Sequence, residues 1–360
     1  MATEYERFPK NWKIVPFTDA FSDQTVGQTK LKKDDYLEYG ELPIIDQGQE
    51  FISGFTNNMQ AKCDVNLPCI LFGDHTKNFK FVTKPFVLGA DGVKVLSETE
   101  NINPKFAYYY LKTLDLPDVG YSRHFRFLKR TFFPIPPLEE QKRIAAILDK
   151  ADRVRRKRQE AIRLTEELGR SIFIDMFGNL FAFLTGKQKH EKGFLYCKLG
   201  DQITLQRGFD LLKKDCTEGI YPVISSGGIH TYHDRYKAKG PGVLLGRKGS
   251  VGRVHYVEED YWPHDTTLWI KDFNNNNQVF VYHFFRLFPI LRFEASTASP
   301  TLNRNRLHPL QVFWPDRELQ TKFANSISVI NKYGDRNSFH FLQSENLFNS
   351  LLQRAFRGEL

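Results

Sequence analysis

The sequence predicts a mixed α/β (α+β) protein: two similar globular domains joined by two long antiparallel coiled-coil helices, arranged as a pseudo-twofold internal repeat. Two observations predict this class. The segment 136–141, which begins with two prolines, leads into a long charged helical pattern, and segment 315–320 leads into a second one. The same offset of 179 positions relates Gln141 to Gln320 and recurs between glycines and prolines upstream. A repeat this long exceeds the roughly 20–50 residues of solenoid units and indicates a duplicated domain with its helix.

We therefore expect a first domain over residues 1–135, a first spacer helix over 136–180, a second domain over 181–314 and a second spacer helix over 315–360. Short apolar runs bounded by Gly or Asp are typical of strands, and they occur at residues 42–45, 69–72, 221–224 and 243–245. Helices are predicted over 106–114, opened by Asn103 and Pro104, and over 280–287. Residues 132–137 form an extended connector because each proline keeps its predecessor out of helical space.

The two long helices carry a heptad pattern with polar residues near its middle. Counted from Ile144, the inward positions of the first are Ile144, Ile147, Ala151, Val154, Arg158, Ala161, Thr165, Leu168 and Ile172. Those of the second are Phe323, Ile330, Tyr333, Asn337, His340, Ser344, Leu347 and Leu351. Arg158 and Asn337 are equivalent, and antiparallel pairing predicts that they meet in one polar layer that fixes register. A helix over residues 138–177 makes a rod of about 60 Å.

Composition and charge narrow the function classes. The 360 residues are 41% hydrophobic and 26% charged, which suits two or three domains with apolar cores. A net charge of +9 favours nucleic acid or a membrane surface as partner, although a soluble protein can be basic without either. The start of the chain has no apolar signal segment, and no run approaches the roughly 18 residues of a membrane span. The four cysteines form no Cys-x-x-Cys pair, so we expect a protein of the reducing cytoplasm.

No catalytic or metal site is predicted. Residues 242–248 have the wrong spacing for a phosphate-binding loop, and the Asn/Asp-Pro-Pro-aromatic motif of amino-methyltransferases is missing from the sequence. Glu140 and Lys142 have the Glu-x-Lys spacing found in nucleases. However, they lie at the start of a predicted helix, and the sequence offers no acidic residue as their partner. The ten histidines lack the spacing of metal ligands. We therefore expect no catalytic residue, metal or cofactor in this chain.

A glycine-rich basic turn is the clearest binding signal. It spans residues 245–254 in the second domain, and the candidate DNA contacts there are Arg247, Lys248, Ser250 and Arg253. Glycines let a backbone approach phosphate, while Arg and Lys neutralise phosphates or bind guanine edges. The corresponding loop of the first domain, residues 72–80, offers Lys77, Asn78 and Lys80. The alternative is a solvated hairpin turn. Different loops on similar strands are what two distinct half-site specificities need.

A second pair of basic segments precedes the prolines. Residues 122–130 and 301–307 coincide through Leu128 and Leu307. Arg and Asn suit bidentate reading of guanine and adenine, so both segments are candidate DNA contacts; the alternative is a charged surface loop. The candidate residues are Arg123, His124, Arg126, Lys129, Asn303, Arg304, Asn305 and Arg306.

The repeated connector and helix resemble a known family. Residues 133–145, Phe-Pro-Ile-Pro-Pro-Leu-Glu-Glu-Gln-Lys-Arg-Ile-Ala, are similar to the central region of type I restriction-modification specificity (S) subunits. Residues 353–360 are similar to their C-terminal ending, and residues 72–76 and 246–252 to segments of their target-recognition domains. The resemblance covers essentially the whole chain. It departs in the second helix, which is more polar and carries Gly334.

The resemblance implies two target-recognition domains that each read one half of a split double-stranded DNA sequence. It also implies that the helices act as spacer and as docking surface for methyltransferase (M) subunits, and that a restriction/motor (R) subunit joins for cleavage. The chain would then be a non-catalytic subunit in a bacterial or archaeal cytoplasm. The rival readings are a self-contained DNA-modifying enzyme and a nucleic-acid-binding scaffold without sequence reading. The DNA sequence and spacer length are not encoded in any short motif.

Overall fold

The computed structural model describes residues 8–90, 92–118, 120, 122–178, 180, 194–212, 217–293 and 300–360. Residues 181–193, where the sequence predicts the second domain to begin, and Cys216 lie outside these ranges. The chain divides into two compact units. The first unit is Met1–Gln159 with Ser338–Leu360, and the second is Glu160–Asn337. Since both divisions fall inside long helices, each unit contains one part of each helix.

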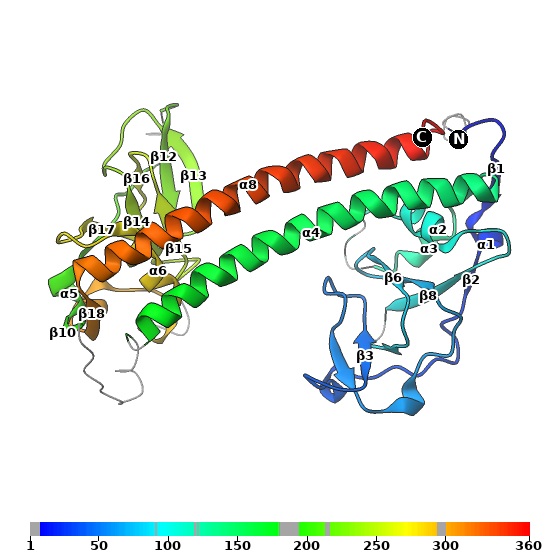
Figure 1. The fold of residues 1–360 in the computed structure, drawn as a ribbon, viewed down its shortest axis with the longest axis horizontal. Helices are drawn as coiled ribbons and strands as arrows, with labels where there is room; N and C mark the ends of the chain where they lie inside the picture. Colours follow the sequence, from blue (N-terminus) through cyan, green and yellow to red (C-terminus); the bar gives the residue numbers. More distant parts are fainter. Residues whose placement is uncertain are drawn as a thin grey trace. The chain divides into compact units, whose positions relative to one another are not determined.

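In both units, short strands and helices precede a long helix (Figure 1). The elements before α4 (Leu138–Phe177) are β1 (Lys13–Pro16), α1 (Phe17–Ala20), β2 (Phe21–Asp23), η1 (Lys33–Asp35), β3 (Leu42–Ile45), β4 (Gly54–Thr56), η2 (Met59–Ala61), β5 (Cys69–Gly73), β6 (Phe79–Val82), β7 (Val87–Leu88), β8 (Val93–Glu98), α2 (Pro104–Leu111), α3 (Phe125–Leu128) and β9 (Phe132–Ile135). Those before α8 (Arg317–Ala355) are β10 (Phe194–Lys198), α5 (Leu199–Gln202), β11 (Thr204–Arg207), β12 (Tyr221–Ser225), β13 (Gly228–His233), β14 (Gly242–Gly246), β15 (Val254–Val257), β16 (Trp262–Pro263), β17 (Thr267–Asp272), α6 (Gln278–Leu287), η5 (Ile290–Phe293), α7 (Arg304–Leu307) and β18 (Gln311–Pro315).

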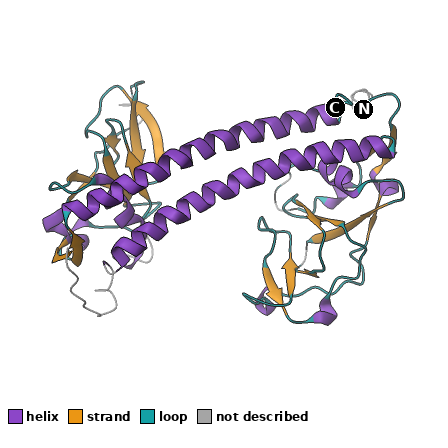
Figure 2. Ribbon diagram, in the orientation of Figure 1, coloured by secondary structure: helices purple, strands orange, loops and turns teal. Residues whose placement is uncertain are grey.

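The two units repeat one sheet topology (Figure 2). The four-stranded sheet has the order β2-β8-β5-β6 in the first unit and β11-β17-β14-β15 in the second. The three-stranded sheet β4-β3-β7 likewise matches β13-β12-β16, and each contains one parallel pair, β3 with β7 and β12 with β16. The antiparallel pair β1-β9 matches β10-β18. The internal duplication predicted from the sequence is therefore confirmed.

Most of the predicted local elements are confirmed. The four apolar runs form β3, β5, β12 and β14, and the two predicted short helices are α2 and α6. Asn103 caps α2, since its side-chain oxygen accepts the Phe106 N–H at 3.0 Å. The connector over residues 132–137 includes a true strand, β9, because Phe133 is buried while its backbone pairs with β1.

A buried glutamine fixes the start of each long helix. Gln141 and Gln320 both donate to the carbonyl five residues before them, at 2.8 and 2.9 Å. Gln141 accepts the N–H of Asn103, and Gln320 accepts that of Asn277, each at 2.8 Å. Asn103 and Asn277 are the N-caps of α2 and α6. The repeated glutamine therefore joins the long helix to the short helix in each unit.

The polar tract at residues 274–277 is partly interior. Asn276 is buried, and its side-chain oxygen accepts hydrogen bonds from Trp314 Nε1 and Gln320 Nε2, both at 2.7 Å. Its amide nitrogen donates to the Gln202 carbonyl at 2.7 Å. An amide is stable in the interior here because each of its polar atoms has a partner.

Within each unit the parts of α4 and α8 run antiparallel, as predicted. In the first unit Arg155 of α4 pairs with Glu345 of α8, and Arg143, earlier on α4, contacts Leu360, just beyond the end of α8. In the second unit the corresponding contacts are Thr165–Gly334, Gly169–Ile327 and Phe173–Phe323, so residue numbers rise along α4 as they fall along α8. α8 continues through Gly334, where an added Cβ would lie 3.5 Å from Thr165, an ordinary contact. The glycine therefore does not interrupt the helix.

The inward stripe of α4 lies one residue later than predicted. Ile144 is buried; Ile147, Ala151, Arg158, Ile172, Ile330, Asn337 and Leu351 are half-buried; Val154, Leu168, Tyr333 and Leu347 are exposed. These last four do not pack between the two helices, and their alternative role as partner contacts stays a prediction. The buried positions of α4 include Leu148, Asp152, Gly169 and Phe173 instead, and on α8 Phe348 is buried in place of Leu347. A count based on aliphatic residues passes over Asp152 and Gly169, so it selects the adjacent stripe.

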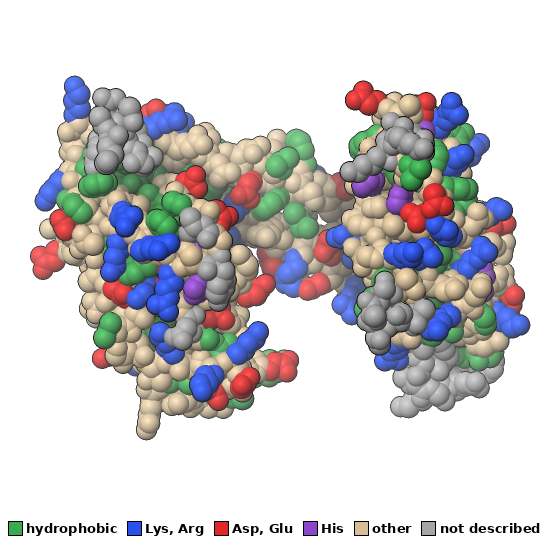
Figure 3. Space-filling view, turned by 180° about the vertical axis from the view of Figure 1, so that it is seen from behind, with side chains coloured by type: hydrophobic (Ala, Val, Ile, Leu, Met, Phe, Trp, Pro, Cys, Tyr) green, Lys and Arg blue, Asp and Glu red, His purple; other side chains and the backbone are tan. Residues whose placement is uncertain are grey.

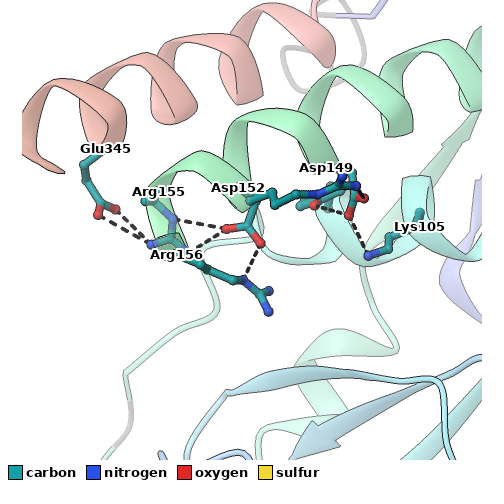
Figure 4. A network of polar contacts seen from close by, with 8 residues as sticks. Lys105, Asp149, Asp152, Arg155, Arg156 and Glu345 are labelled. Atoms are coloured by element: carbon teal, nitrogen blue, oxygen red, sulfur yellow. Dashed lines mark hydrogen bonds and ion pairs between the residues drawn. The ribbon is translucent and has the colours of Figure 1, made fainter. Parts of the chain in front are cut away.

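A charged cluster occupies part of this stripe in the first unit (Figure 4). Asp152, only 3% exposed, is its centre. The ion pairs are Arg155–Asp152 (2.7 Å), Arg156–Asp152 (2.7 Å), Arg155–Glu345 (3.3 Å) and Lys105–Asp149 (2.6 Å). Burying charges costs desolvation energy, so we expect this cluster to contribute more to the choice of register than to stability. Arg158 and Asn337 belong to different units, so their predicted polar layer stays a prediction.

Candidate nucleic-acid interface

In the first unit, the loop after β5 meets the basic segment that contains α3. Asp74, at the start of this loop, is buried and accepts the N–H of Phe125 on its carboxylate at 2.7 Å. Its carbonyl accepts the N–H of His124 at 2.8 Å. Lys77 adopts a left-handed conformation with φ of 60° at the turn. The two candidate segments of the first domain therefore form one surface.

The second unit joins the corresponding segments by its backbone. The Leu302 N–H donates to the Arg247 carbonyl at 3.0 Å, and Lys248 pairs with Thr301 as an isolated bridge. The turn between β14 and β15 needs glycine at position 252, because φ is 79° and an added Cβ would lie 2.6 Å from Ile290. The basic turn and the α7 segment therefore lie together, as their counterparts do in the first unit.

Most of the candidate DNA contacts are accessible. Ten are exposed: Arg123, Arg126, Lys129, Lys248, Ser250, Arg253, Asn303, Arg304, Asn305 and Arg306. Lys77, Asn78 and Arg247 are half-buried. The Asn303 side-chain oxygen accepts the Asn305 N–H at 3.0 Å and so caps α7. Lys and Arg side chains also appear on the visible faces of both units, interspersed with acidic residues (Figure 3).

Two candidates are not at the surface, and the expectation that they contact DNA is corrected. Lys80 is 6% exposed, and its ammonium donates to the carbonyls of Asp46, at 2.8 Å, and Glu50. Burial lowers the pKa of Lys80, although the negative charges of Asp46 and Glu50 act to raise it. His124 is 1% exposed, and its Nδ1 lies 3.0 Å from the Asp74 carbonyl. Both side chains hold loops in place, so a phosphate has no access to them.

The sequence interpretation missed Arg207, at the end of β11. Arg207 lines a depression of about 590 Å³ together with Arg247 and Arg304. Its Nη2 donates to Asp210 at 2.7 Å and to Asp265 at 3.1 Å. A basic residue followed by Gly208 at a strand end was the available signal, but the distance in sequence from the basic turn hid its relation to Arg247.

Over the described ranges, no group of three or more His, Cys, Asp or Glu side chains is arranged to hold a metal ion. None of the described helices combines the length and apolar character that crossing a membrane requires.

Comparison with known proteins identifies the family. The model of the type I restriction modification DNA specificity domain matches residues 9–165 and again residues 191–346. The fold is similar to that of the S subunit of a type I restriction-modification system from M. genitalium, with a TM-score of 0.65, 18% identity and 96% of each chain covered. It is also similar to a chain from a structure of complex assembly and conformational transition of the type I R-M system, with a TM-score of 0.51 and 14% identity over 98% of this chain and 99% of that one.

The family match covers both repeats and most of the chain, and the structure places the same two basic segments together in each repeat. The chain therefore belongs to the type I restriction modification DNA specificity family: it is a non-catalytic subunit that recognises the DNA target of a restriction-modification complex, whose catalysis resides in the partner subunits.

Proposed function

We propose that this specificity subunit reads a bipartite duplex target, one half-site per domain, with recognition domains over residues 1–135 and 181–314. The observation that carries the proposal is the repeated scaffold with unlike loops: β5 leads to Asp74 and Lys77, whereas β14 leads to Arg247 and Lys248. Phosphate contacts position a protein on DNA and base contacts select the sequence. Two scaffolds with different side chains therefore select two different half-sites.

The proposed DNA contacts are the accessible residues of the two joined segments in each domain. In the first domain they are Lys77, Asn78, Arg123, Arg126 and Lys129, and in the second Arg247, Lys248, Ser250, Arg253, Asn303, Arg304, Asn305 and Arg306. The complex works in the prokaryotic cytoplasm, where its DNA is.

We further propose that methyltransferase subunits dock on the exposed apolar residues of the long helices, and that a restriction/motor subunit joins the assembly. Val154 is equivalent to Tyr333, and Leu168 to Leu347, at the repeat offset of 179. All four are between 46% and 62% exposed. Each unit thus carries one member of each pair, and apolar side chains exposed at equivalent places are typical of repeated partner contacts.

The test of half-site reading is co-expression with the neighbouring methyltransferase subunit, followed by mapping of modified bases across a host genome. The expected result is a split motif with two fixed halves and a fixed gap. Exchange of residues 12–133 for those of another specificity subunit changes one half and leaves the other intact. A complex that forms but modifies no defined motif contradicts the proposal.

The test of docking is co-purification of the methyltransferase subunit with a double variant, Leu168→Asp and Leu347→Asp. Loss of the methyltransferase subunit is expected, because two charges then enter apolar contacts. Leu164→Asp is the matched control, since Leu164 is 50% exposed but its equivalent is the polar Gln343. Equal retention by the double variant and the control contradicts this docking surface.

A further inference from the structure

The depression beside Arg207 combines three separate segments of the second unit. Arg207 comes from β11, Arg247 from the turn after β14, and Arg304 from α7, while Leu268 and Phe209 contribute apolar walls. Three arginine residues therefore line one concavity of about 590 Å³. Arg247 is held there, because its Nη1 donates to the Asp265 carbonyl at 3.2 Å.

Two carboxylates of unequal exposure bind Arg207. The Asp265 side chain is 21% exposed and lies 3.1 Å from Nη2, whereas the Asp210 side chain is 74% exposed and lies 2.7 Å from the same atom. The partly buried Asp265 binds Arg207 from outside the depression and orients its guanidinium. Asp210 is a solvent-exposed anion three residues along the chain, and an exposed pair of this kind is worth only about 0–1 kcal/mol. A stronger anion can therefore replace Asp210.

We propose that this depression receives a phosphate of the DNA backbone, with Arg207 as the central contact and Asp210 as the internal anion that DNA displaces. The inference rests on the DNA-reading function proposed above and names the chemistry of one part of its surface. Asp265 is a positioning residue, since it acts through Arg207.

Shape favours a phosphate over a base edge. Base edges lie inside the grooves, so a side chain must protrude to reach them, whereas phosphates line the outer ridges of the duplex. Arg207, Arg247 and Arg304 line a concave surface, while Lys248 and Arg253 are exposed on the adjoining turn. Arginine also matches the geometry of phosphate through paired N–H donors. The depression therefore sets position and affinity, and the turn reads sequence.

Among the described residues, this arrangement occurs in the second domain. β2, the counterpart of β11 in the sheet order, contains no arginine, and its last residue, Asp23, pairs with Lys94 at 2.9 Å. An acidic residue at this strand end offers no attraction to phosphate. The two domains are therefore expected to differ in how many phosphates they contact.

The test measures binding of the full-length chain to a fluorescently labelled duplex of random sequence over a salt series. Arg207→Ala is expected to reduce the slope of log affinity against log salt by about one, the value for one lost phosphate contact. Lys271→Ala is the matched control, because it also removes one positive charge. Lys271 lies near the end of β17, whereas Leu268, which lines the depression, lies near its start. Arg207→Lys retains the charge and is expected to keep most of the slope.

A second variant has the opposite expected effect, so a folding defect cannot mimic the result. Asp210→Asn removes the competing anion and is expected to tighten binding about two- to fivefold. Glu259→Gln, at another exposed acidic residue of the same unit, makes the same charge change and is expected to leave affinity nearly unaltered.

Each outcome decides the inference. If Arg207→Ala behaves like Lys271→Ala, or Asp210→Asn like Glu259→Gln, while the parent chain binds DNA, the phosphate site is wrong and the proposed function stands. A change of the methylated motif with Arg207→Lys indicates a base contact and also overturns the phosphate assignment. A parent chain that binds no duplex DNA overturns both proposals.

Discussion

The two units use the same frame but secure their loops with different side chains. Lys80 is the second residue of β6, and His255 is the second residue of the corresponding strand β15. The Lys80 ammonium donates to the carbonyls of Asp46 and Glu50, in the loop after β3. The His255 Nε2 lies 3.1 Å from the carbonyl of Ser226, in the turn after β12. One structural link is thus kept with a different chemical group.

This difference shows how such a scaffold can change its target. The fold requires only that a polar group on the second strand position bind a carbonyl of the neighbouring loop, and both an ammonium and an imidazole meet that requirement. The loops are free to differ as long as this link is made. Residues such as Lys80 therefore look like DNA contacts in sequence, although their role is to hold the contacts in place.

The largest expected effect tests the feature that the units share most closely. Gln141→Leu and Gln320→Leu each leave an N–H and a carbonyl unpaired in the interior. We expect either variant to lower the free energy of unfolding by about 3 kcal/mol, measured by urea denaturation. Gln159→Leu, exposed on α4, is expected to have little effect. If only one of the two buried glutamines matters, the helix starts are not equivalent.

The next effect tests the charged cluster around Asp152, which has no counterpart among the described residues of the second unit. Asp152 is buried between arginines, whereas its equivalent at the repeat offset, Asn331, is exposed. Asp152→Ala leaves Arg155 short of its nearest carboxylate and is expected to cost about 2 kcal/mol. Asn331→Ala is expected to change stability by less than about 0.5 kcal/mol. Thermal and urea unfolding of both variants compare them, and equal losses would show that the charged cluster has no special role.

The smallest effect is the change of stability with pH, which we expect to have opposite signs in the two units. Burial lowers the pKa of His283 to about 4. As pH falls, His283 is therefore protonated in the unfolded chain at a higher pH than in the folded chain. The second unit therefore loses stability as pH falls from about 6.5 toward 4. Burial raises the pKa of Glu98 to about 7, so the folded first unit retains this proton. The contribution of Glu98 to the stability of the first unit is greatest below about pH 4.5 and is lost as pH rises through 7.

Hydrogen exchange of β8 and β17, corrected for the intrinsic pH dependence, measures the two responses separately. Between neutral pH and pH 6 we expect protection of β8 to rise and protection of β17 to fall, each roughly threefold to fivefold. Glu98→Gln removes the first change. His283→Tyr removes the second; it introduces the residue found at Tyr109, which lies as far from the N-cap of α2, Asn103, as His283 lies from the N-cap of α6, Asn277. Parallel changes in both strands would contradict this assignment.

The sequence by itself determined the duplication, the strands β3, β5, β12 and β14 and the starts of the long helices. These features depend on local chemistry: apolar runs between turn residues, prolines that end an extended segment, and asparagine caps. The joined basic segments were also visible as separate candidates, because clusters of Arg, Lys and Asn are evident without a structure.

Only the tertiary structure decided which of these side chains face solvent. The inward stripe of α4 contains Asp152 and Gly169, which become interior because Arg155 on α4 and Ile327 on α8 complement them. Lys80 is removed from the surface by carbonyls more than 25 residues away in the chain, and Arg207 is brought beside Arg247 by the pairing of β11, β17 and β14. Burial of a charge depends on partners distant in sequence, so no local pattern can reveal it.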